Sequence, residues 1–187
     1  MYHIREDKRS AQSAELIYQC ILKLMDQKSY DLISVTDIQR KSGIARTTFY
    51  RCFDNISDVF LWKCDEAFHT AFSTYHPPAF RGEFDLARHF VNYWIQHYKI
   101  LEILMRINRL DIIFTCHMKN AYILEEKYGV LPNLPRAHTE YYVSVRTGFT
   151  ISILLAWLKG GRKENADEII EIIREQFAVL KNDMDIL

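Results

Sequence analysis

The amino-acid sequence predicts an all-α protein of about nine helices. Apolar residues recur at positions three and four apart over most of the chain, which is the spacing of a helix that buries one face. No segment alternates apolar and polar residues clearly enough to indicate a strand. Hydrophobic residues make up 49% of the 187 positions, which is sufficient to build a core.

The first helix is expected from about Ser10 to Gln27, after a mobile basic arm over residues 1–9. Helical spacing marks its buried stripe, which consists of Ala14, Ile17, Ile21 and Leu24. Lys8 and Arg9 lie where such an arm could contact phosphates.

Residues Ser34 to Phe53 predict two short helices separated by a tight turn. Ser34 is a good N-cap, and Asp37 follows it at the spacing of a capping box. Gly43 can take the left-handed conformation that ends a helix. A second helix then begins at Arg46, and its Phe49 and Phe53 face inward together because they are four residues apart.

The outward positions of these two helices suit the surface of a DNA duplex. Arginine can donate two hydrogen bonds to a guanine edge, and threonine can contact a thymine methyl group. A tyrosine hydroxyl can bind a phosphate oxygen. A capped helix, a glycine turn and a short basic helix favour a helix-turn-helix, and the alternative is an ordinary helix pair with a solvated polar face. The expected DNA-contacting residues are Ser34, Thr36, Gln39, Arg46, Thr47, Thr48, Tyr50 and Arg51.

This stretch resembles the DNA-binding domain of the TetR/AcrR family of transcriptional regulators. The resemblance is carried by Ser-Val-Thr-Asp-Ile from Ser34, by Gly-Ile at Gly43, and by Thr-Thr-Phe-Tyr-Arg-Cys-Phe from Thr47. It implies a homodimeric repressor that binds a palindromic site on double-stranded DNA and is released by a small-molecule effector. Two positions depart from the family pattern: Ala45 replaces the usual serine cap, and Ile56 replaces the usual lysine.

The chain is expected to contain two domains. Residues 10–60 form the helix-turn-helix domain, and residues 61–187 form a ligand-binding and dimerisation domain. A long helix over residues 56–75 joins them, with Asn55 and Asp58 as its cap pair.

Further helices are expected from Phe84 to Tyr98, over 100–107 and 110–128, from Thr139 to Leu158, and over 165–181. The helix from Thr139 is apolar nearly all round and should be covered on most sides. The last two helices can pair with a second copy of the chain or pack within one monomer, and the family resemblance implies the dimer. The expected interface residues are Val145, Phe149, Ser152, Ile153, Ala156, Ile170, Ile173 and Phe177.

Aromatic residues are frequent in the middle of the chain, and they can line a pocket for an apolar or aromatic effector or simply fill a core. The expected lining is Phe90, Trp94, Tyr98, Phe114, His117 and Tyr122. A protein partner in place of a metabolite is the alternative effector, and a helical enzyme with an unrecognised site is a third hypothesis.

Charge and composition narrow the remaining possibilities. The 24 basic and 24 acidic residues cancel, so DNA contact must come from local charge and be sensitive to salt. We expect no metal, cofactor or catalytic residues, because no zinc spacing, phosphate loop or nucleophile elbow occurs. We expect a cytoplasmic protein without a membrane span, with four reduced cysteines and no apolar signal sequence. The longest apolar run, from Gly148 to Leu158, is too short to cross a bilayer.

Overall fold

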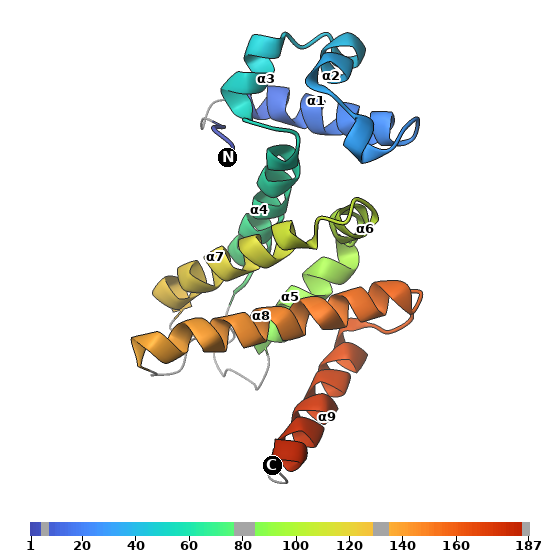
Figure 1. Cartoon of the computed structure of the whole chain (residues 1–187). Coiled ribbons are helices and arrows are strands. Elements are labelled where there is room, and N and C mark those ends of the chain that lie inside the picture. The colour runs from blue at the N-terminus through green and yellow to red at the C-terminus, as the bar shows by residue number, and fades with distance from the viewer. Residues whose placement is uncertain (5–7, 77–84, 129–134, 185–187) are drawn as a thin grey trace. The chain divides into compact units, whose positions relative to one another are not determined.

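The computed structural model describes residues 1–4, 8–76, 85–128 and 135–184, with the side chains of 124–128, 136 and 180–184 excepted. Within these residues the chain forms nine α-helices and one short 3₁₀ turn, η1 (Tyr30–Leu32), and contains no strand (Figure 1). The all-α class predicted from the sequence is therefore confirmed.

The chain divides into two compact units, Met1–Glu66 and Ala67–Leu187. The boundary falls inside helix α4 (Ser57–Ser73), within the linking helix where the sequence placed it, although after Glu66 rather than after residue 60. Asn55 and Asp58 form the predicted cap pair of this helix: each accepts a hydrogen bond from the other's backbone N–H, at 3.1 Å.

The first unit is built on helix α1 (Lys8–Met25). Helices α2 (Val35–Ser42) and α3 (Arg46–Cys52) both pack against it (Figure 1). The four residues of the predicted stripe of α1 are all buried. Ile38 of α2 and Phe49 of α3 complete the core, since each exposes only 1% of its surface.

Residues 1–3 do not form the free arm that the sequence predicted. The backbone N–H of His3 donates to the carbonyl of Cys52 at 2.8 Å, and Tyr2 forms an isolated bridge with Phe53. The Tyr2 hydroxyl donates to Asp65 at 2.7 Å. Lys8 and Arg9 belong to α1, which begins two residues before the predicted Ser10, and residues 5–7 lie outside the described residues.

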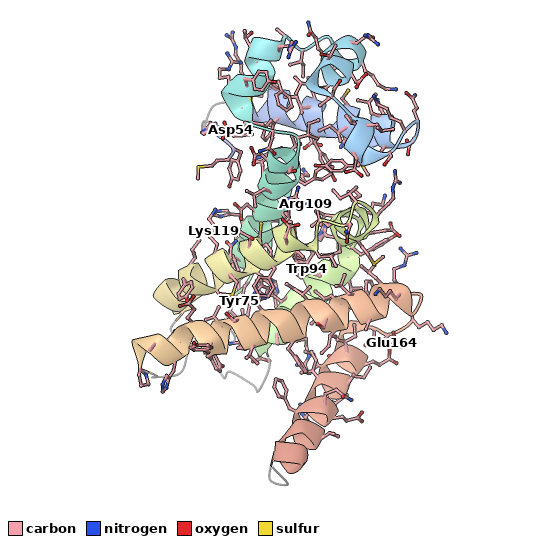
Figure 2. All side chains as sticks on the ribbon, viewed as in Figure 1. Asp54, Tyr75, Trp94, Arg109, Lys119 and Glu164 are labelled. Carbon is pink, nitrogen blue, oxygen red and sulfur yellow. The ribbon has the colours of Figure 1, made fainter. Side chains whose placement is uncertain are left out.

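Among its described residues, the second unit contains five further helices besides the end of α4. They are α5 (Asp85–Gln96), α6 (Lys99–Arg106), α7 (Leu110–Tyr128), α8 (Arg136–Lys159) and α9 (Ala166–Met184). Helix α5 packs against α9, and α7 packs against both α6 and α8. Trp94, labelled in Figure 2, lies in the core of this unit, with 1% of its surface exposed.

Helix α8 starts earlier than the sequence predicted, and other parts of the chain cover less of its surface than expected. It begins at Arg136 rather than Thr139, because Pro135 takes the N-cap position, where no intrahelical N–H bond is lost. One face is uncovered within the chain: Tyr141 and Val145 expose 75% and 69% of their surfaces. Ser152 and Ala156 continue that exposed face at helical spacing.

By length and composition, residues Ala137–Lys159 of α8 could cross a membrane, and no other helix in the described part of the chain could do so. This stretch is longer than the apolar run recognised in the sequence. Its mean hydropathy of 1.2 is low, and helices that pack inside soluble proteins meet the same criterion.

Candidate functional site

The start of α2 is held by a complete capping box. The Ser34 hydroxyl accepts from the backbone N–H of Asp37 at 3.2 Å, and the Asp37 carboxylate accepts from the backbone N–H of Ser34 at 2.9 Å. The ammonium group of Lys28 also donates to this carboxylate, at 2.6 Å. Its bonds to Lys28, and then to Ser34, hold the pKa of Asp37 below its usual value.

The turn after α2 depends on the backbone of Gly43. This residue has a φ of 73°, and its N–H donates to the carbonyl of Gln39 at 2.9 Å. A Cβ added there would meet no atom within 4 Å, so the glycine is needed for its conformation and not for space. The Ser42 hydroxyl also stabilises this turn. It donates to the backbone carbonyl of Ile38 and accepts from the backbone N–H of Ile44.

Helix α3 has only seven residues and no side-chain cap, because Ala45 stands at its N-cap. A helix this short is not stable alone in water. Phe49 and Cys52 anchor it in the core, and Phe53 follows as its buried C-cap. The Phe49 ring centroid lies 5.4 Å from that of Tyr50 and 5.9 Å from that of Phe53. These contacts fix which face of α3 is turned outward.

The outward face of α3 carries the residues predicted for DNA contact. Arg46, Thr47 and Arg51 are exposed, and Tyr50 exposes 48% of its surface. Thr48 is half-buried. In the described part of the chain, no carboxylate forms an ion pair with Arg46 or Arg51, so both guanidinium groups remain free to donate.

Helix α2 adds to this surface. Ser34, Thr36 and Gln39 are exposed, although the Ser34 hydroxyl is already occupied by the capping box. Arg40 and Lys41 are also exposed in its last turn and were not among the predicted contact residues. Their position beside the turn could have been recognised from the sequence. We call the exposed residues of α2 and α3 together the α2–α3 surface.

The second unit contains a cavity of ≈ 70 Å³. It is lined by Phe68, Phe72, Leu86, Ala87, Phe90, Val91, His117, Ala121, Val143, Arg146, Thr147, Thr150 and Ile173. Two of the six residues predicted to line an effector pocket, Phe90 and His117, line this cavity.

The other four predicted lining residues lie elsewhere. Trp94 fills the core beside Phe68, with ring centroids 5.1 Å apart. The Tyr98 ring is covered by the guanidinium of Arg162 at 4.1 Å. Phe114 and Tyr122 expose 40% and 44% of their surfaces on α7. These corrections have one cause: aromatic character does not reveal which face of a helix is turned inward.

A polar wall of the cavity was missed by the prediction. Thr147 is fully buried, and its hydroxyl lies 2.8 Å from Nδ1 of His117. Burial, followed by the nearby charge of Arg146, lowers the pKa of His117 to about 4. A signal did exist in the sequence, because Arg146 is the only charged residue between Glu140 and Lys159.

The predicted dimer residues divide into two groups. Val145, Ser152 and Ala156 are exposed on α8, and Phe177 of α9 exposes 45% of its surface. Phe149 and Ile153 are half-buried. The ring of Phe149 stacks on that of Phe177 at 4.6 Å.

Ile170 and Ile173 do not belong to a free surface. They expose 0% and 6% and pack with Val91 and Trp157 inside their own chain. The Trp157 indole N–H donates to the carbonyl of Glu164, labelled in Figure 2, at 2.9 Å. The stripe of α9 therefore faces α5 and α8 rather than a second copy of the chain.

In residues 1–4, 8–76, 85–128 and 135–184, no group of three or more His, Cys, Asp or Glu side chains is placed to hold a metal ion. None of the four cysteines forms a disulfide bond, and all four are buried.

Comparison with known proteins supports the fold and names no function. No family model matches this chain, and no curated protein matches it. A crystal structure of Lin0861 from Listeria innocua is similar, with a TM-score of 0.76 and 14% sequence identity. The match covers 96% of this chain and 98% of that one, so the likeness in fold extends over both units.

Proposed function

We propose that this protein is a DNA-binding transcriptional regulator, a homodimeric repressor that a small-molecule effector releases from its operator. The observation that carries the proposal is the α2–α3 surface. Arg46 and Arg51, which form no ion pair with any described residue, project together with Tyr50 from a helix whose other face is anchored by buried phenylalanine residues. The family resemblance of residues Ser34 to Phe53 points to the same function.

Three residues of α3 have definite tasks in this proposal. Arg46, in the first turn, donates to the O6 and N7 atoms of a guanine in the major groove. Thr47 contacts a neighbouring base or phosphate, and the Tyr50 hydroxyl binds a phosphate oxygen that sets the register. The absence of a serine cap at Ala45 removes one contact from the start of α3.

Two copies of this surface are needed for selectivity, because seven residues make few base contacts. The exposed face of α8, formed by Tyr141, Val145, Ser152 and Ala156, supplies a surface for pairing with a second chain. Small side chains at 152 and 156 let two helices approach closely. The dimer then presents two α3 helices about 34–36 Å apart to a palindromic operator.

The cavity is the proposed effector site. If its occupation favours a conformation that fits the operator poorly, the effector weakens DNA binding. The same linkage requires DNA to weaken effector binding by the same factor. Helix α4 runs without a break across the boundary between the two units and is the proposed route of this coupling.

The test begins with selection of a duplex from a random pool by the full-length protein, followed by titration at fixed salt. Arg46→Ala is expected to weaken binding of that duplex by about 1–3 kcal/mol, and Tyr50→Phe by less. Arg174→Ala on α9 is the matched control, because it removes an exposed arginine of the second unit. The proposal is refuted if no duplex is enriched, or if Arg46→Ala binds as tightly as the control.

A second candidate has the same fold and DNA-binding role but a protein effector. The exposed aromatic side chains of Phe114 and Tyr122 on α7 favour it. Filling the cavity with Ala121→Leu discriminates between the two. The substitution abolishes effector release if the effector is a small molecule in the cavity, and leaves it intact if the effector is a protein on α7.

A further inference from the structure

The two walls of the cavity differ sharply in chemistry. Its aromatic wall includes Phe68 and Phe72 of α4 and Phe90 of α5. Its polar wall consists of His117 of α7 together with Arg146, Thr147 and Thr150 of α8. Thr150 follows Arg146 by four positions and Thr147 by three, so it lies beside both on α8, and all three line the cavity. A ligand that fits both walls must itself be apolar at one end and polar at the other.

The polar wall is positively charged. The guanidinium of Arg146 lies 5.6 Å from the ring centroid of Tyr142, and no carboxylate among the described residues forms an ion pair with it. His117 brings no negative charge, and it is neutral above pH 6 because burial keeps its pKa at about 4. A partly buried cation without a counter-ion is unfavourable, and an anion beside it would be stabilised.

Some hydroxyl and guanidinium groups of the polar wall already form hydrogen bonds within the protein, and others remain available to a ligand. The hydroxyl of Thr147 is occupied by His117 at 2.8 Å. The hydroxyl of Thr150, one helical turn from Arg146, makes no side-chain hydrogen bond within the described residues. Arg146 and Thr150 are therefore the two groups of α8 that can donate to a ligand.

We propose that the cavity binds a small monocarboxylate, with its carboxylate on Arg146 and Thr150 and its apolar body against Phe72 and Phe90. This deepens the proposed function, since it rests on the cavity being the effector site and names the class of effector. The volume of ≈ 70 Å³ sets the size. Because a dry cavity of about 150 Å³ accommodates benzene, a short aliphatic acid is favoured over an aromatic one.

The experiment measures binding directly, by calorimetric titration of the full-length protein without DNA at pH 7 and fixed ionic strength. The probes are butyrate and benzoate, each compared with its neutral counterpart, 1-butanol or benzyl alcohol. Butyrate is expected to bind most tightly. Arg146→Gln should weaken butyrate by about tenfold or more, because a charge-assisted hydrogen bond is lost, and should leave 1-butanol unchanged.

Two variants locate the effect. Lys159→Gln removes an exposed cation at the other end of α8 and should bind butyrate as the wild type does. Ala121→Leu fills the cavity and should abolish binding of both butyrate and 1-butanol. The inference is overturned if 1-butanol binds as tightly as butyrate, if Arg146→Gln and Lys159→Gln behave alike, or if Ala121→Leu still binds butyrate.

The result is independent of DNA binding. If butyrate binds through Arg146 but does not change the affinity for a selected duplex, the ligand class stands and its regulatory role is refuted. If no duplex is selected, the DNA-binding proposal fails while the carboxylate site is judged on the titrations alone.

Discussion

The burial of His117 makes the stability of the second unit depend on pH. An unperturbed histidine has a pKa of about 6.5, whereas burial and the charge of Arg146 lower the pKa of His117 to about 4. The unfolded chain therefore binds a proton at a higher pH than the folded one. The contribution of neutral His117 is fully present above about pH 6.5 and is lost as the pH falls toward 4.

The size of the loss follows from the two pKa values. Between them, stability falls by up to about 1.4 kcal/mol for each pH unit. The free energy of unfolding should therefore decrease by about 2.5 kcal/mol between pH 7.5 and pH 4.5 on account of this one side chain. That is a large fraction of the stability of a typical domain.

The assay is urea denaturation of the wild type and of His117→Asn, followed by tryptophan fluorescence at one-unit steps from pH 7.5 to 4.5. Asparagine cannot titrate, but its amide can occupy the place of Nδ1 and keep the bond to Thr147. Subtracting the two pH profiles removes the contribution of Asp37 and every other group. NMR titration of the His117 ring supplies the folded-state midpoint directly.

A difference profile that stays flat between pH 6.5 and 4.5 would refute this reasoning, and so would an NMR midpoint near 6.5. Either result would mean that the imidazole is hydrated and that α7 and α8 do not enclose it.

Three further predictions concern the segment that contains α2 and α3 and the exposed face of α8. Gly43→Ala should destabilise the first unit by about 1 kcal/mol in urea denaturation, because alanine is strained at a φ of 73°, and Gly43→Asn by less. Equal stability of Gly43→Ala and the wild type would contradict this. Phe49→Ala should cost about 3–5 kcal/mol and remove amide-exchange protection throughout Met1–Glu66, because Phe49 is buried and anchors α3; retained protection would show that α3 has another anchor. Val145→Glu should convert the proposed dimer to monomers in sedimentation velocity, while Thr115→Glu on α7 should not; a dimer that survives Val145→Glu would exclude this face of α8.

The local features of this chain could be predicted from the sequence, because each depends on residues that are only a few positions apart in the chain. The capping box of Ser34 and Asp37, the left-handed Gly43 and the inward pair of Phe49 and Phe53 all follow from spacings of a few residues. Helix boundaries erred by only a few residues, since periodicity marks the middle of a helix better than its ends. The exposed positions of α3 were predicted in the same way, from the spacing of its buried phenylalanine residues.

Only the tertiary structure decided which faces of the later helices are covered. Ile170 and Ile173 look like an exposed stripe in sequence but pack beneath Trp157. Phe114 and Tyr122 look like pocket residues but lie at the surface. The cavity joins side chains from residue 68 to residue 173, and its polar wall depends on Arg146 and Thr147 of α8 reaching His117 of α7. Contacts of this kind depend on how helices distant in sequence pack against one another, and hydrophobic periodicity carries no information about the partner of an apolar face.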